Sequence, residues 1–167
     1  MPEISEEQRT ALLAGLGSLR KYCFSLTGAP ADADDLLQTT VERILDKGMP
    51  AGADATKWAF RVSRNAWIDE LRAREVRQRY PTEPAVEAAE APSAETSADN
   101  ERSISSLSAA LNELPEEQRV ALLMVAVEGK TYAEAAALLE VPTGTIMSRV
   151  ARARRQLAER WKQSHNE

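Results

Sequence analysis

The stretch VPTGTIMSRVARARRQL, residues 141–157, holds four arginines in a chain whose formal net charge is −5. A helix turns by about 100° per residue, which puts four apolar residues on one narrow stripe: Ile146, Val150, Ala153 and Leu157. The opposite edge then carries Thr145, Ser148, Arg152 and Arg155. A helix with one buried edge and a small polar and arginine edge fits the major groove of DNA, where arginine pairs with guanine. A solvated basic face would give the same pattern, so this helix alone leaves both interpretations open.

Two further helices are expected before this stretch. The first begins after Pro115, has glutamates in its first turn, and ends at Gly129. Thr131 then caps the second, and Glu134 stands three residues later, where a capping box places it. Residues 104–167 therefore read as helix, helix, turn, helix, which is a helix-turn-helix pattern.

The turn between the last two helices runs through Glu140 and Val141 to Pro142. Thr143 is expected to cap the helix that follows it. This order of helix, turn and helix favours DNA binding over a solvated basic face as the role of the arginine edge.

Composition predicts an all-α protein. Hydrophobic residues make up 43% of the 167 residues and charged residues 28%, and there are only seven glycines. A single cysteine, Cys23, and a single histidine, His165, exclude an internal disulfide and a metal cluster of these residues, and no cofactor is expected. Cys23 is expected to be a small core residue.

No membrane insertion is expected, and the chain is expected to be cytoplasmic. The longest apolar run, VALLMVAV from Val120, is far too short to cross a bilayer. The N-terminal residues lack the basic start and apolar stretch of a signal peptide.

Residues 81–103 are predicted to be a flexible acidic linker between two small helical domains, residues 1–80 and 104–167. The linker holds six acidic residues and one basic residue, is rich in Pro, Ala, Ser and Glu, and has no hydrophobic residue larger than Val86. Such a segment buries too little apolar surface to offset its ordering entropy. We expect proteases to cut it before either domain.

Residues 32–45, DADDLLQTTVERIL, predict an amphipathic helix. Its inward side is expected to hold Leu37, Val41, Ile44 and Leu45. Its outer face is expected to hold Asp35, Gln38 and Glu42.

Residues 58–80 predict a long helix on which four arginines lie within roughly 80° of one another: Arg61, Arg64, Arg72 and Arg79. Trp58 and Trp67 accompany them. Arginines beside aromatic rings suit opened DNA, whose bases stack on the rings. The alternative is that both tryptophans belong to the core.

Four motifs, in this order and spacing, resemble the two conserved regions of bacterial extracytoplasmic-function (ECF) sigma factors: DADDLLQTTVERIL, WAFRVSRNAWIDELR, LNELPEEQRVALL and TYAEAAALLEVPTGTIMSRVARAR. The resemblance covers nearly the whole chain outside the linker and the extreme ends. It implies a non-catalytic initiation subunit that binds core RNA polymerase and promoter DNA, and it implies an anti-sigma factor as a further partner. The first domain would dock on the β′ clamp helices and read the minus-10 element, and the second would sit on the β flap and read the minus-35 element.

The resemblance assigns roles to particular residues. Contacts with polymerase would come from Asp35, Gln38 and Glu42. The Arg-Asn-x-x-Ile-Asp signature falls on Arg64, Asn65, Ile68 and Asp69, and the loop before Trp58 would hold a flipped promoter base. Contacts with promoter DNA would come from Arg61, Arg64, Asn65 and Arg72, and from Thr143, Thr145, Met147, Ser148, Arg149, Arg152 and Arg155.

Four positions depart from the family pattern. Thr39 stands where Glu is usual, Met147 where a basic residue is frequent, Ala135 where Ile is customary, and Glu140 where the turn usually has Gly. If that turn keeps a left-handed residue, Glu140 costs on the order of 1 kcal/mol.

Other functions remain as alternatives. A sigma-like decoy would bind an anti-sigma factor without reading DNA, and it would be expected to have lost its basic faces. A repressor with an N-terminal ligand domain would leave the N-terminal motifs unexplained. An enzyme fits least, because the sequence has no glycine-rich phosphate loop and no nucleophile with a histidine partner. The acidic linker would suit the basic walls of the polymerase cleft, and it would equally suit a solvated tether.

Overall fold

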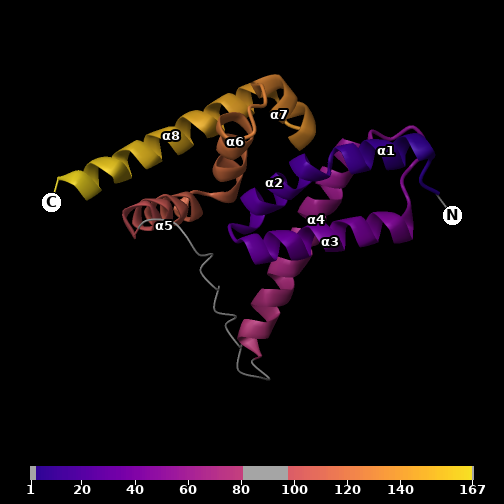
Figure 1. Cartoon of the computed structure of the whole chain (residues 1–167), viewed down its shortest axis with the longest axis horizontal. Coiled ribbons are helices and arrows are strands. Elements are labelled where there is room, and N and C mark those ends of the chain that lie inside the picture. The colour runs from indigo at the N-terminus through magenta and orange to yellow at the C-terminus, as the bar shows by residue number, and fades with distance from the viewer. Residues whose placement is uncertain (1–2, 81–97, 167) are drawn as a thin grey trace.

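The computed structural model describes residues 3–80 and 98–166, and every regular element in these two ranges is an α-helix. Figure 1 shows the last helix extending away from the rest. The predicted all-α fold class is confirmed. None of the helices in the described ranges combines the length and apolar character needed to cross a membrane.

The N-terminal half consists of α1 (Glu6–Ala14), α2 (Leu16–Thr27), α3 (Pro30–Lys47) and α4 (Ala55–Arg79). Its core gathers around Tyr22 of α2 and Phe60 of α4, whose rings stack with centroids 4.4 Å apart. Leu19, Leu26 and Ile44 are also fully buried. Ser5 and Gln8 form a capping box that begins α1, and Asp54 caps α4.

Cys23 is completely buried, as predicted. Its Sγ lies 3.9 Å from the Oγ of Ser63, which in turn lies 3.0 Å from the Oγ1 of Thr40. Burial raises the pKa of the Cys23 thiol to about 11. The three side chains tie α2, α3 and α4 together with polar contacts inside the core.

The buried stripe of α3 differs from the prediction. It consists of Ala33, Leu36, Thr40 and Ile44. Leu45 was expected to face inward, but it is 59% exposed. The sequence pattern fits a buried stripe through either Leu36 or Leu37, because the two residues are adjacent. The structure buries the stripe with Leu36, in which the Thr40 hydroxyl donates to the Leu36 carbonyl and hydrogen-bonds the Ser63 hydroxyl.

The C-terminal half consists of α5 (Ala98–Glu113), α6 (Glu116–Ala126), α7 (Tyr132–Leu139) and α8 (Thr143–His165). Val120 and Met124 of α6 pack with Ile146 and Val150 of α8 in its core. The helix-turn-helix prediction corresponds to α7 and α8.

Helix α5 begins earlier than the sequence suggested. Residues 98–103 were assigned to the linker, but they form its first turns. Once the later part of α5 is fixed against α6 and α8, each preceding residue adds a helical hydrogen bond at little further cost. The rest of the expected linker, residues 81–97, lies outside the described residues.

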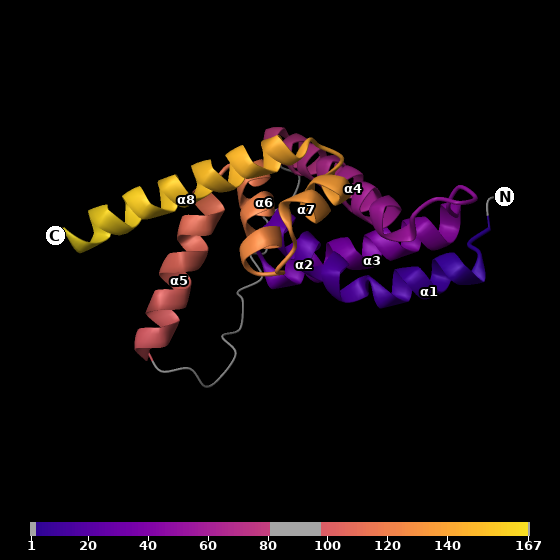
Figure 2. The same ribbon diagram turned by 90° about the horizontal axis from the view of Figure 1, so that it is seen from above.

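The two halves are in contact with each other. Helix α6 packs along α2, and α7 packs against α4. Figure 2 shows α6 and α7 lying close to α2 and α4 in the view from above. The buried residues of both halves form one hydrophobic cluster.

Candidate nucleic-acid interface

Helix α8 has the two edges that its sequence predicted. Ile146, Val150 and Ala153 are buried against α6 and α7, and Leu157 is partly buried. Arg152 and Arg155 are exposed on the other side. Within the described residues, neither guanidinium forms an ion pair, so both are available to an anion.

The start of α8 presents small residues to solvent. Thr143 and Ser148 are exposed, Thr145 is partly buried, and Met147 is 53% exposed. A thioether there offers an apolar contact, such as one with a thymine methyl group, in place of a charged one.

Thr143 does not cap α8, contrary to the prediction. Pro142 occupies the N-cap position with an extended backbone, and Thr143 is the first helical residue. The Pro142 carbonyl accepts hydrogen bonds from the amides of Thr145 (3.0 Å) and Ile146 (3.4 Å). The helix therefore starts one residue earlier than expected and has no side-chain cap.

The helix before it begins and ends as predicted. The Thr131 hydroxyl accepts a hydrogen bond from the Glu134 amide at 3.0 Å and caps α7. Glu140 ends α7 in the left-handed conformation, with φ 57° and ψ 44°. It is the one residue other than glycine with positive φ in the described part of the chain.

Arg149 occupies a different environment from Arg152 and Arg155. Its side chain is only 21% exposed, and Nη2 lies 3.4 Å from Oε2 of Glu117 on α6. The side chain lines a cleft between the two halves and does not lie along the exposed edge of α8.

The basic residues of α4 split into two groups. Arg61, Arg64 and Asn65 are exposed on the part of α4 that faces the C-terminal half and line the same cleft as Arg149. Arg72 is exposed farther along α4 and does not line the cleft.

The two tryptophans of α4 also differ. Trp58 is partly buried, and the guanidinium of Arg61 lies 5.6 Å from its ring centroid. Trp67 is 6% exposed and its indole N–H donates to Oε2 of Glu116 at 3.3 Å. Trp67 is therefore a core residue with a satisfied polar atom, and its ring is not free to stack on a DNA base.

The outer face of α3 carries the expected side chains. Asp35, Gln38 and Glu42 are all exposed, and Gln38 Nε2 donates to Glu42 Oε1 at 3.0 Å. An exposed polar face on a helix whose other side is buried can dock on a partner without disturbing the core.

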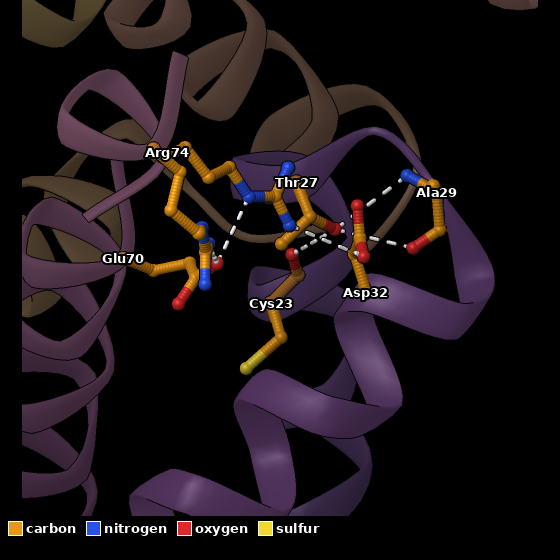
Figure 3. Close-up of polar contacts among 7 residues, drawn as sticks. Cys23, Thr27, Ala29, Asp32, Glu70 and Arg74 are labelled. Atoms are coloured by element: carbon orange, nitrogen blue, oxygen red, sulfur yellow. Dashed lines mark hydrogen bonds and ion pairs between the residues drawn. The ribbon is translucent and has the colours of Figure 1, made fainter. Parts of the chain in front are cut away.

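Arg74 fixes the start of α3 against α4. As Figure 3 shows, it reaches between Glu70 and Asp32, with Nε 3.0 Å from Glu70 Oε1 and Nη2 3.3 Å from Asp32 Oδ1. The hydrogen bond from Arg74 lowers the pKa of Glu70 below its usual value. The guanidinium also lies 5.2 Å from the ring centroid of Trp67.

Sequence reasoning missed the residues that join the halves. Arg119 donates two hydrogen bonds from α6 to the end of α2, and Glu116 and Glu140 contact α4 through Trp67 and Arg61. The local sequence around each of these residues is accounted for by the helices of the C-terminal half alone. No local pattern could therefore reveal their contacts with the N-terminal half.

Comparison with known proteins identifies two regions of the chain. Residues 14–77 match the family model for sigma-70 region 2, and residues 104–157 match the model for sigma-70 region 4. The chain is 35% identical over 163 residues to the ECF RNA polymerase sigma factor EcfG of Rhodopseudomonas palustris, covering 93% of this chain and 85% of that protein.

Solved structures show the same fold. The sigma factor RpoE of Bartonella quintana, determined in complex with the anti-sigma factor NepR, has a TM-score of 0.68 and 30% identity, covering 95% of this chain and 98% of that one. The anti-anti-sigma factor PhyR of the same organism, determined with NepR, has a TM-score of 0.59, with 91% of this chain and 49% of that chain covered; at 16% identity it shares the fold alone. The two region models, their order along the chain and the extent of the match to EcfG establish that this chain belongs to the ECF sigma factors of the sigma-70 family.

Proposed function

We propose that this sigma factor divides its work between its two halves. Residues 1–80 bind core RNA polymerase and read the minus-10 element, residues 104–167 read the minus-35 element, and 81–103 link them. The exposed edge of α8 carries this proposal, because Arg152 and Arg155 form no ion pair within the described residues and lie opposite the buried Ile146, Val150 and Ala153.

Base reading is assigned to Ser148, Arg152 and Met147 at the start and middle of α8. Their exposure lets them reach base edges, whereas Arg149 is held by Glu117 and suits a phosphate once that ion pair opens. Thr143 and Thr145, near the uncapped amides of the first turn, suit a backbone phosphate. Arg155 lies farther along the helix and is assigned to a phosphate.

The N-terminal half supplies the other contacts. Asp35, Gln38 and Glu42 are proposed to bind the β′ clamp helices, and the C-terminal half is proposed to sit on the β flap. Arg61, Arg64, Asn65 and Arg72 are proposed to hold opened DNA near the minus-10 element; all four are exposed on α4.

An anti-sigma factor is the proposed regulator. The support is the sigma factor RpoE, which was solved with the anti-sigma factor NepR and which this chain matches at 30% identity over nearly its full length. We place the protein in the cytoplasm and assign it no enzymatic activity and no cofactor, because the proposed role is promoter recognition by contact.

Run-off transcription with purified core polymerase on a pool of random promoters tests the proposal. Enrichment of templates that share two spaced elements supports it. Binding to an anti-sigma factor without polymerase binding or transcription would instead identify a decoy.

A further inference from the structure

The inference concerns the loop between α3 and α4, residues 48–54, and it rests on the minus-10 role proposed above for the N-terminal half. One side chain of α1, Gln8, bonds this loop across 42 and 45 positions of the sequence. Figure 1 and Figure 2 both show the loop and the start of α1 at the same end of the N-terminal half.

Gln8 uses both ends of its carboxamide. Its Oε1 accepts the backbone N–H of Ser5 at 3.1 Å, which is one half of the capping box that begins α1. Its Nε2 donates to the carbonyl of Pro50 at 2.9 Å and to that of Ala53 at 3.3 Å. A carboxamide NH₂ group carries two N–H donors, so each carbonyl receives one. The side chain is only 8% exposed, and water therefore competes little for these bonds.

The two carbonyls stand at the ends of one tight turn. The Ala53 amide donates to the Pro50 carbonyl at 3.1 Å, so residues 50–53 form a β-turn. Gly52, the third residue of the turn, has φ 74°, the positive value that a type II turn requires at this position. The NH₂ group of Gln8 therefore bridges the first and last residues of the turn and limits how far they can separate.

The elements on either side of the turn are fixed as well. Leu12 of α1 is buried and packs against the start of α4, which holds the helix that carries Gln8. Met49 is 1% exposed and anchors the beginning of the loop. The Asp54 carboxylate accepts the Lys57 amide at 3.0 Å and caps α4. Both ends of the loop are thus held by their neighbours, and the turn between them is held by Gln8.

The tip of the turn is open to a ligand. Ala51 and Gly52 are exposed, and in the part of the chain that the structure describes their amides form no hydrogen bond. The loop leads into the first two turns of α4, where the guanidinium of Arg61 lies over the ring of Trp58. An unstacked base is recognised through hydrogen bonds to its edge, and two free amides in a fixed turn suit the acceptor atoms of such an edge.

We propose that Gln8 is a positioning residue for promoter reading. It holds the turn at residues 50–53 in one conformation, so that the amides of Ala51 and Gly52 meet the edge of one unstacked base of the minus-10 element. The capping box by itself accepts either Glu or Gln at this position, but only Gln also donates to two carbonyls. The contacts with the loop, and not the cap of α1, therefore require Gln8.

Three variants separate the two roles of this side chain. Gln8→Glu keeps an acceptor for the Ser5 amide and removes both donors to the loop. Gln8→Ala removes the acceptor and the donors together. Ser5→Ala is the matched control, because it removes the hydroxyl that accepts the Gln8 amide at 3.1 Å, weakens the start of α1, and leaves the bonds from Nε2 to the loop in place.

Hydrogen exchange of the Ala53 amide, followed by nuclear magnetic resonance in the free full-length chain, measures the turn directly. Gln8→Glu and Gln8→Ala should raise its exchange rate by about five- to tenfold, the effect of losing two neutral hydrogen bonds of which one is long. Ser5→Ala should leave the rate close to that of the wild type. Circular dichroism confirms that each variant is folded.

Base discrimination by the holoenzyme measures the positioning role. The templates carry the promoter selected by run-off transcription, opened in advance across the minus-10 element, with each base placed in turn at every position of the non-template strand. Both Gln8 variants should lower the ratio of initiation rates between the preferred base and the others by about five- to tenfold at one position only. Ser5→Ala should keep the wild-type ratio at every position.

The outcomes separate this inference from the proposed function. Equal losses of initiation on all templates, or the same loss of discrimination in Ser5→Ala, would show a merely structural role and overturn the proposal. Unchanged exchange at Ala53 in folded Gln8→Glu and Gln8→Ala would overturn the bridge itself. The exchange measurement contains no polymerase and no DNA, so faster exchange with no transcription by the wild-type holoenzyme would refute the minus-10 role, and with it the base contact, while the bridge to the loop stands.

Discussion

Replacing Glu140 by glycine changes the free energy of unfolding in two opposite ways: it removes backbone strain and it removes an ion pair. A left-handed backbone costs a residue with a Cβ about 1–2 kcal/mol, and glycine returns roughly 0.5–1 kcal/mol of that through its greater freedom in the unfolded chain. The net backbone gain is therefore about 0.5–1 kcal/mol. The substitution also removes the ion pair with Arg61, and because both side chains are about half exposed this costs only about 0–1 kcal/mol.

Glu140→Gln separates the two effects, because it removes the charge and keeps the left-handed strain. Glu140→Gly should exceed Glu140→Gln in stability by about 0.5–1 kcal/mol, which corresponds to a Tm higher by roughly 1–4 °C for a chain of this size. Against the wild type, the glycine variant should be near neutral at about 0.1 M salt and more stable at about 1 M, where the ion pair is screened.

Urea unfolding followed by far-ultraviolet circular dichroism measures these differences at both salt concentrations. If the glycine variant is no more stable than the glutamine variant at either concentration, the left-handed residue is not strained, and the reasoning about Glu140 fails.

Three other results are expected. Arg152→Ala should lower affinity for a matched duplex by about 1–3 kcal/mol and relax preference at adjacent base pairs, while Arg155→Ala should weaken all duplexes alike and reduce the salt slope by roughly one unit; equal losses on every duplex in fluorescence anisotropy would remove the base-reading role of Arg152. Asp35→Arg with Gln38→Ala should weaken binding to core polymerase in a titration while changing stability by less than about 0.5 kcal/mol, and unchanged affinity would contradict the proposed docking face. The pKa of Cys23 is raised above its unfolded value, so its contribution to stability is present below about pH 9 and should be lost as the pH rises toward 11, with native-state alkylation slow throughout; rapid alkylation at neutral pH would show that the thiol is not buried.

Much of the fold could be predicted because its signals are local. The cap at Thr131 and the buried stripe of α8 follow from residue type and helical spacing within a few positions. The left-handed conformation of Glu140 does not follow from its residue type; only the resemblance, which has Gly at this turn, pointed to it. The exposed face of α3 followed from the same spacing.

The errors have physical causes that local patterns do not contain. Thr143 and Pro142 can both begin a helix, and in the structure Pro142 occupies the N-cap position. Leu36 and Leu37 compete for one buried face, and the polar contact of Thr40 with Ser63 decides between them. Contacts such as that of Arg119 with α2 join residues more than ninety positions apart and depend on the tertiary arrangement alone.

The left-handed turn at Glu140 also has a genetic consequence. Every glutamate codon becomes a glycine codon by a single transition at its second base. One such mutation would relieve the backbone strain and remove the carboxylate that faces Arg61, without requiring a second, compensating change in the fold. The conformation of this turn and its contact with Arg61 are therefore accessible to selection in one step, while the sequence of α8 stays the same.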